Sequence, residues 1–88
     1  MITLIVTADT LTQRQAEAFA RAYRDATPEK RSRIEERGAV VRAAAAAGWF
    51  GAALTAAGVD ELPSRAVNAL AEAVNALYSE AIAPDPKA

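Results

Sequence analysis

The chain has 88 residues, with 10 basic and 11 acidic side chains, a net charge of −1, and neither cysteine nor histidine. These properties exclude disulfide bonds and the usual cysteine and histidine zinc sites, and they provide no overall attraction to nucleic acid or to anionic membranes. We expect one domain at this length, and because so small a core is marginally stable, we also expect self-association or a protein partner, unless helix packing alone provides enough stability.

Alanine supplies 24 of the 88 residues, which leaves few large apolar side chains to build a core. Alanine favours helix strongly and buries little area, so helices that pack closely through small faces are expected. The sequence therefore predicts a mainly α fold, a small domain of three to four helices over residues 1–83 that includes a short N-terminal β-strand or extended arm. An extended tail is predicted at residues 84–88, where the prolines cannot continue a helix.

The N-terminal segment at residues 2–7, ITLIVT, is rich in β-branched residues and is typical of a strand. A lone strand cannot pair its own backbone groups. It must therefore pair with a second copy, add to a partner's sheet, or lie over the helices as an extended arm. If it adds to another chain, its alternate side chains are candidate partner contacts: Ile2, Leu4 and Val6.

Two helices are predicted in the first half of the chain. The first opens at Thr12, which forms a capping-box pattern with Gln15 and is followed by apolar residues at helical spacing. The second is predicted to open at Thr27 and to end at Gly48, since glycine commonly follows the last turn. Gly38 within it either marks the close approach of another helix or breaks the helix in two.

The last helix has the clearest apolar pattern, with steps of three and four residues at Val67, Leu70, Val74 and Leu77. This spacing fits either packing within the domain or a parallel two-stranded coiled coil. Because only about two heptads are present, we favour packing within the domain.

The sequence contains no recognisable set of catalytic residues. Without cysteine or histidine the common nucleophile–base pairs are missing, and no glycine-rich phosphate loop is present. We therefore expect a protein that is not an enzyme, with no catalytic residues, no cofactor and no metal.

A basic segment at residues 30–42 is a candidate electrostatic contact, through Arg31, Arg33, Arg37 and Arg42. Such a face can bind phosphates, but three glutamates interleave or flank it and no aromatic residue lies among the bases for stacking. The pattern favours a solvated, charge-paired helix over a nucleic-acid site.

The stretch AAAAAGWFG contains the only tryptophan, Trp49, followed by Phe50. Aromatic side chains dominate interface hot spots, but a ring after a helix end also commonly closes the core. Because adjacent residues point in different directions, we expect at least one of the two rings near the surface, and both are candidate partner contacts.

The second half of the chain contains the segments VVRAAAAAGWF, VDELPSRAV and LYSEAIAPDP within residues 40–86. With these segments it resembles small tail-morphogenesis proteins of tailed bacteriophages. The resemblance implies a tail assembly chaperone or related factor that binds tape-measure or tail-tube proteins and has no catalytic activity. No functional residue follows from it.

Two other functions remain open at this point: inhibition of a host defence complex, and nucleic-acid binding through residues 30–42. No segment has the roughly 20 apolar residues of a membrane span, and the N-terminus lacks the pattern of a signal peptide. We therefore expect a cytoplasmic protein without membrane association, located in a bacterial host if it comes from a phage.

Overall fold

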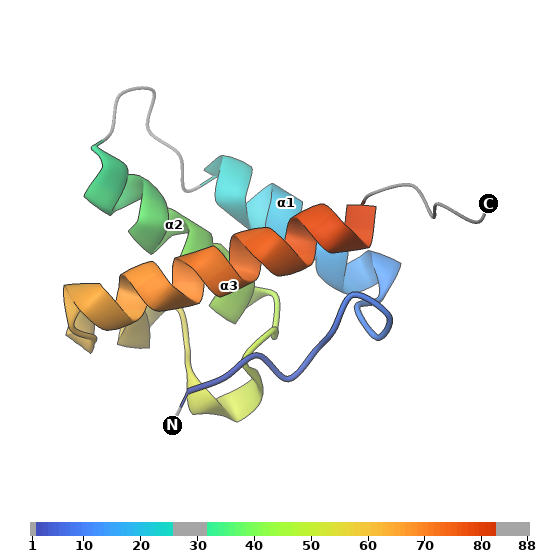
Figure 1. Ribbon diagram of the computed structural model, residues 1–88, viewed down its shortest axis with the longest axis horizontal. Coiled ribbons are helices and arrows are strands. Elements are labelled where there is room, and N and C mark those ends of the chain that lie inside the picture. The colour runs from blue at the N-terminus through green and yellow to red at the C-terminus, as the bar shows by residue number, and fades with distance from the viewer. Residues whose placement is uncertain (1, 26–31, 83–88) are drawn as a thin grey trace.

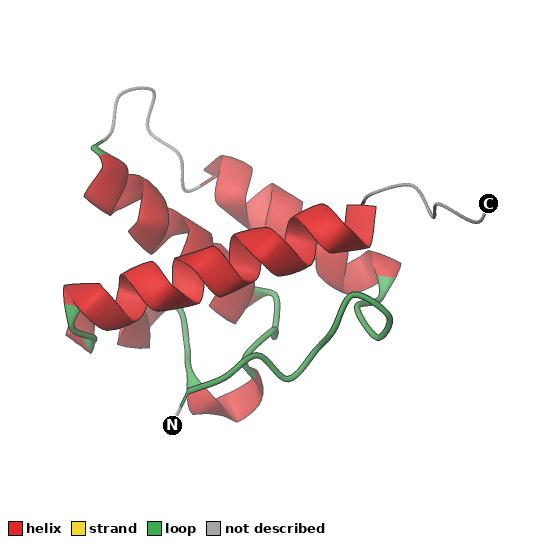
Figure 2. Cartoon of the chain, in the orientation of Figure 1, coloured by secondary structure: helices red, strands yellow, loops and turns green. Residues whose placement is uncertain are grey.

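The computed structural model describes residues 2–25 and 32–82, and these form three α-helices and two 3-10 turns (Figure 1). Figure 2 shows helices and loops, with no β-strand among these residues. The predicted mainly α fold is confirmed, with three helices. In chain order the elements are α1 (Gln13–Asp25), α2 (Arg33–Ala46), η1 (Gly51–Ala53), η2 (Ala57–Glu61) and α3 (Ser64–Ile82).

The central helix is α2, which packs against both α1 and α3. Figure 1 shows α3 running across the other two helices. From Gly38 to Ala45 the helix is buried on most of its sides. Its buried residues are Gly38, Ala39, Val40, Val41, Ala43, Ala44 and Ala45. Because most of these side chains are small, the neighbouring helices can lie close to the α2 backbone.

The apolar pattern of α3 faces the core of the domain. Val74 and Leu77 are buried, and Val67 and Leu70 pack against the buried cluster. Of the two predictions for this pattern, packing within the domain was favoured, and the structure shows this packing. None of the helices in the described residues has the length and apolarity needed to cross a membrane. The predicted tail at residues 84–88 lies outside the described residues.

The start of α1 follows the predicted capping box. The Gln15 backbone N–H donates to Thr12 Oγ1 at 3.2 Å, and the Thr12 backbone N–H donates to Gln15 Oε1 at 3.0 Å. Two donors that the first helical turn leaves unpaired are thus satisfied reciprocally. The cap fixes where α1 begins, and the helix buries Phe19 against the core.

The start of α2 differs from the prediction. A complete capping box is formed by Ser32, which has extended backbone, and Glu35. The helix therefore begins at Arg33. The prediction of one continuous helix from Thr27 is wrong, because the backbone of Ser32 is extended. Thr27 itself lies outside the described residues. The reason is local, because Ser32 has a glutamate three residues later whereas Thr27 has a lysine there.

The capping box of α2 gives a prediction for Glu35. The Ser32 backbone N–H and hydroxyl donate to Glu35 Oε1 at 3.1 and 3.0 Å, and they hold the pKa of Glu35 below its ordinary value. The resulting stabilisation is present above the ordinary glutamate pKa and is lost as pH falls through the folded-state pKa.

Replacing Ser32 with alanine is expected to lower the free energy of unfolding by about 1 kcal/mol. It should also raise the pKa of Glu35 towards its ordinary value, because the hydroxyl donor is removed. An NMR titration of the Glu35 carboxyl measures the second effect, and Ser79→Ala on the exposed side of α3 is the control. An unchanged Glu35 pKa in the Ser32 variant would show that the Ser32 hydroxyl does not lower this pKa.

Gly48 ends α2 as predicted. It has a φ of +83°, its N–H donates to the Ala45 carbonyl at 3.1 Å, and the Trp49 N–H donates to the Ala44 carbonyl at 3.0 Å. This pair of bonds is the Schellman motif, which requires a left-handed residue after the helix. The turn also directs Trp49 back under the helices.

Replacing Gly48 with alanine is expected to lower the free energy of unfolding by about 1–2 kcal/mol, because the left-handed backbone disfavours a Cβ atom. No atom lies within 4 Å of a Cβ built at this position, so the loss comes from the backbone alone. Chemical denaturation measures it. The Gly48→Asn variant should lose less than the alanine variant, and equal losses would point to a cause other than backbone conformation.

The N-terminal segment forms an extended arm, and the β-strand alternative is wrong for this structure. Its backbone bonds to the turn after α2 through the Ile5 N–H, which donates to the Trp49 carbonyl at 2.9 Å. No strand lies beside it among residues 2–25 and 32–82, so no ladder forms. The arm ends in a turn closed by the Thr7 N–H, which donates to Thr10 Oγ1 at 2.7 Å.

Candidate functional site

Both rings of the Trp49–Phe50 pair are buried, with 0% exposure each. The expectation that at least one of them lies near the surface is wrong, and in this structure neither can contact a partner. The Trp49 ring stacks on Phe19 with centroids 4.6 Å apart, and its Nε1–H donates to the Gln15 carbonyl at 3.2 Å. The buried face of α2 consists largely of small side chains, so large side chains from elsewhere must fill the core, and both rings serve that purpose.

The three arm residues predicted to contact a partner lie on the inner side of the arm. Ile2, Leu4 and Val6 are partly buried and pack against the core. The alternation expected of a strand is thus kept, with Ile5 between them 63% exposed. The side of the arm that faces outward carries the alternate residues Thr3, Ile5 and Thr7, which are exposed.

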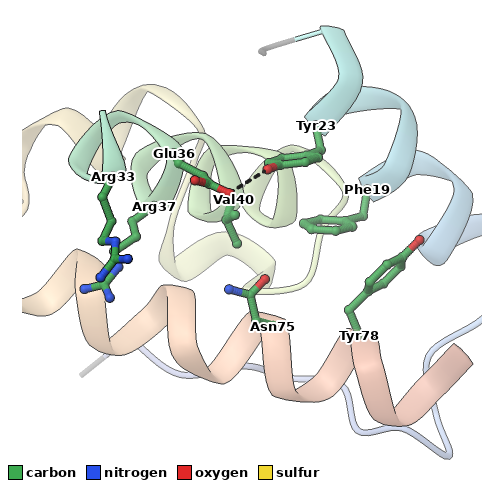
Figure 3. A pocket seen from close by; sticks show the side chains of 8 residues that line it. All are labelled: Phe19, Tyr23, Arg33, Glu36, Arg37, Val40, Asn75 and Tyr78. Atoms are coloured by element: carbon green, nitrogen blue, oxygen red, sulfur yellow. Dashed lines mark hydrogen bonds between the residues drawn. The ribbon is translucent and has the colours of Figure 1, made fainter. Parts of the chain in front are cut away.

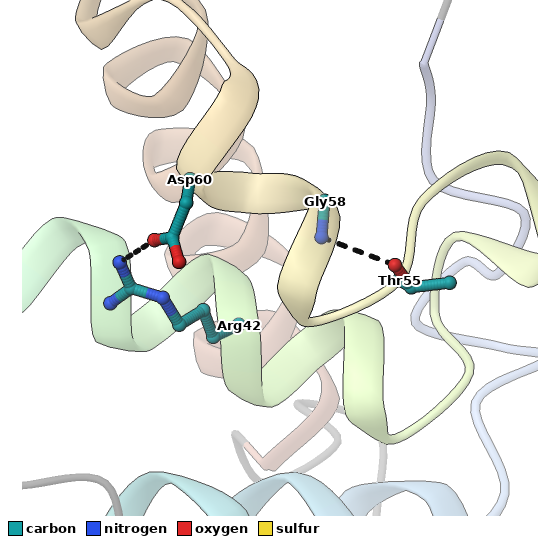
Figure 4. Close-up of polar contacts among 4 residues, drawn as sticks. All are labelled: Arg42, Thr55, Gly58 and Asp60. Carbon is teal, nitrogen blue, oxygen red and sulfur yellow. Dashed lines mark hydrogen bonds and ion pairs between the residues drawn. The ribbon is translucent and has the colours of Figure 1, made fainter.

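Of the four arginines of the basic segment, the three that the structure describes do not share one surface. Arg31 lies outside the described residues. Arg42 forms an ion pair with Asp60 of η2, drawn in Figure 4 beside the Gly58–Thr55 turn contact. Arg33 and Arg37 instead line a pocket between the helices.

Gly38 explains how Arg42 reaches Asp60. A Cβ atom at Gly38 would lie 3.1 Å from Arg42 Nη1, so the absence of a side chain leaves room for the guanidinium. The helix continues through Gly38, and the alternative in which it breaks α2 is wrong. The close neighbour is a side chain of the same helix and not another helix.

A pocket of about 320 Å³ lies where α1, α2 and α3 meet (Figure 3). We call it the aromatic–arginine pocket. Figure 3 shows Arg33 and Arg37 projecting from α2 towards α3, and Asn75 projecting from α3 towards α2. Its lining residues are Phe19 and Tyr23 of α1, Arg33, Glu36, Arg37 and Val40 of α2, and Asn75 and Tyr78 of α3.

The apolar wall of this pocket is fixed by ring contacts. Phe19 lies parallel to Tyr23 with centroids 6.0 Å apart, and its centroid is 5.0 Å from that of Tyr78. Below them, Trp49 stacks on Phe19. Such contacts between rings stabilise the fold beyond the burial of the rings themselves. The apolar wall is therefore part of the core of the domain.

The polar side of the pocket carries more positive than negative charge. The Tyr23 hydroxyl donates to Glu36 Oε1 at 3.4 Å. No ion pair or hydrogen bond engages the Arg33 or Arg37 side chain within the part of the chain that the structure describes. The Asn75 side chain likewise makes no hydrogen bond there. The pocket thus offers two guanidinium groups and an amide beside an aromatic wall.

Sequence reasoning identified two of the eight lining residues as contacts, Arg33 and Arg37. The aromatic residues come from two helices, and only the four-residue step from Phe19 to Tyr23 is visible in the sequence. Tyr78 and Asn75 belong to the site because of the way α3 packs, which no local pattern in the sequence indicates.

Two smaller hollows lie elsewhere on the described surface. One, of about 170 Å³, lies beside the Arg42–Asp60 pair and is bordered by Ile34, which is 73% exposed. The other, of about 250 Å³, is apolar and lies between Ile2 and the first half of α3. Neither places unengaged charges beside an aromatic wall, so the aromatic–arginine pocket is the stronger candidate site.

Comparisons with known proteins found no relative of this chain. No family model matches the chain, and neither a curated protein nor a solved structure matches it.

Proposed function

We propose that this chain is a non-enzymatic protein-binding factor whose binding site is the aromatic–arginine pocket. One observation carries the proposal: two arginines with no ionic partner among the described residues lie beside a rigid aromatic wall. Aromatic residues and arginine are the side chains that contribute most to protein interfaces. The non-enzymatic part of the proposal rests on the sequence, which has no cysteine or histidine.

We further propose that the partners are phage tail proteins, of the tape-measure or tail-tube class. This part rests on the resemblance of residues 40–86 to small tail-morphogenesis proteins. A chaperone of this kind acts in the cytoplasm of the bacterial host before the tail is complete. Self-association of the chain belongs to the same proposal, because a domain of this size gains stability from an interface.

Nucleic-acid binding is the less favoured function, and a specific contact argues against it. Arg42, one of the predicted phosphate contacts, is engaged by Asp60. Glu35 and Glu36 lie on the same helix as the other arginines, and the net charge of the chain is −1. The chain therefore provides no net attraction to a polyanion, and one of its candidate phosphate contacts is already paired.

Size-exclusion chromatography with light scattering tests the proposal. The purified chain is measured alone and with the tail-tube and tape-measure proteins encoded in the same genome. We expect self-association of the chain alone and a mixed complex with one of these proteins that survives moderate salt. A strict monomer that forms no complex with either partner would refute the assembly role.

The genes beside this one provide a second test. Tail genes on both sides support the assembly role, whereas defence-related genes would favour inhibition of a host defence complex. Binding to DNA that disappears with added salt, in place of protein binding, would favour the electrostatic alternative.

A further inference from the structure

We infer that the aromatic–arginine pocket recognises a short extended segment of its partner in which an aromatic or large aliphatic side chain stands next to an aspartate or glutamate. The inference rests on the proposed protein-binding function and specifies the chemistry of the occupant. It follows from three features of the pocket: its charge, its apolar wall and its amide.

The charge of the pocket favours a carboxylate. Arg33 and Arg37 are four residues apart on α2, so their side chains lie on one face of the helix, one turn from each other. A guanidinium presents paired N–H donors that match the two oxygens of a carboxylate. Glu36 accepts a hydrogen bond from the Tyr23 hydroxyl and forms no ion pair with either arginine among the described residues, so two positive groups face one negative group in the pocket.

The apolar wall favours one large side chain. Phe19 and Val40 are buried beneath the pocket, and the partly buried Tyr78 ring stands at its side. A volume of about 320 Å³ is at the lower end of the range for ligand sites, which suits a single side chain better than a larger ligand. A ring placed there would continue the ring contacts already present between Phe19 and Tyr78.

The amide of Asn75 favours an extended backbone. Its side chain carries both donors and an acceptor and makes no hydrogen bond among the described residues. Figure 3 places it between the two arginines and Tyr78, at the point where a bound segment would pass from its acidic to its apolar residue. The N–H and C=O groups of an extended peptide provide the complementary partners.

A nucleic acid is a poorer occupant of this pocket. Its phosphates would approach the Glu36 carboxylate as well as the two arginines, and the chain as a whole is slightly acidic. An acidic peptide brings only one or two carboxylates to the two guanidinium groups, so it places less negative charge near Glu36 than a row of phosphates does.

The test uses the full chain and three capped, fluorescein-labelled peptides, GSDFDSG, GSNFNSG and GSDADSG. Aspartate on both sides of the ring places a carboxylate near the arginines in either chain direction. In fluorescence anisotropy titrations we expect GSDFDSG to bind about tenfold more tightly than either of the other two. In a 15N NMR titration with GSDFDSG, the Asn75 side-chain amide should shift.

Variants separate this recognition from general charge attraction. The Arg33→Gln/Arg37→Gln variant should bind GSDFDSG and GSNFNSG equally, because the guanidinium groups that distinguish them are gone. The matched control is Arg14→Gln/Arg21→Gln, which removes two exposed arginines from α1 outside the pocket and should keep the preference. Tyr78→Ala should reduce the preference for GSDFDSG over GSDADSG. Thermal melts show that each variant is folded.

Several outcomes would overturn the inference. They are equal binding of GSDFDSG and GSNFNSG by the unmodified chain, no binding of any peptide, a preference retained in the Arg33/Arg37 variant, or tighter binding of a short oligothymidylate. A chain that forms the complex with a tail protein but ignores these peptides would refute this inference alone. A chain that binds GSDFDSG but no tail protein would refute the assembly role and leave the pocket's specificity in place.

Discussion

Replacing Trp49 with alanine is expected to lower the free energy of unfolding by about 3–5 kcal/mol. The ring has 0% exposure, stacks on Phe19, and donates a hydrogen bond to the Gln15 carbonyl, so its removal leaves a cavity and breaks a link between α1 and the turn after α2. For a domain of this size the melting temperature should fall by roughly 12–40 °C. Thermal and chemical denaturation followed by circular dichroism measure both quantities.

Two further variants separate the causes of this loss. Trp49→Phe keeps a ring in the stack but removes the indole donor, and it should cost about 1 kcal/mol for the lost hydrogen bond, plus the effect of the smaller volume. Ile34→Ala removes a large side chain that is 73% exposed, so it should change stability by less than about 0.5 kcal/mol.

The opposite result would give Trp49 the partner-contact role, which the sequence left open beside the core role. If Trp49→Ala weakened partner binding while the free energy of unfolding changed by less than about 1 kcal/mol, the ring would be an interface residue and not a core residue. The structure leads us to expect loss of stability first, with any loss of binding following from damage to the wall of the aromatic–arginine pocket.

Local signals in the sequence predicted the parts of the fold that depend on neighbouring residues. The capping box of Thr12 and the end of α2 at Gly48 each involve residues within a few positions of one another, and both are present. The start of α2 was also readable in principle. Ser32 with Glu35 is a complete capping box, whereas Thr27 followed by proline is only part of the signal.

The arm at residues 2–7 shows what local signals cannot decide. Its β-branched residues favour extended backbone, and extended backbone is what the chain adopts. Whether that backbone becomes a strand depends on a neighbouring strand, which these residues do not specify. The alternation of Ile2, Leu4 and Val6 predicted one apolar side correctly, but that side covers the chain's own core.

The candidate site was the least predictable part because it is assembled from three helices. The direction of the Trp49 and Phe50 rings depends on the Schellman turn at Gly48, which turns the chain back so that both rings enter the core. Arg33 and Arg42 looked equivalent in the sequence. Only the position of Asp60 on η2 distinguishes them, since it engages Arg42 and leaves Arg33 to the pocket.

Replacing Ala44 with leucine is expected to lower the free energy of unfolding by about 1–3 kcal/mol, the usual effect of adding volume to a packed core. Ala44 has 0% exposure on the central helix, and its carbonyl accepts the Trp49 N–H that closes the Schellman turn. A leucine there must displace a neighbouring helix or the Trp49 ring, because close-packed interiors have little space for added methylene groups.

The same substitution at Ala46 is the matched control, because Ala46 lies on the same helix and is exposed. Ala46→Leu should change stability by less than about 0.5 kcal/mol, since it alters helix propensity very little and displaces nothing. Equal effects at the two positions would show that helix propensity decides the result. A loss confined to Ala44 would show that the alanines of α2 are required for their small size, which lets α1 and α3 lie close enough to form the aromatic–arginine pocket between them.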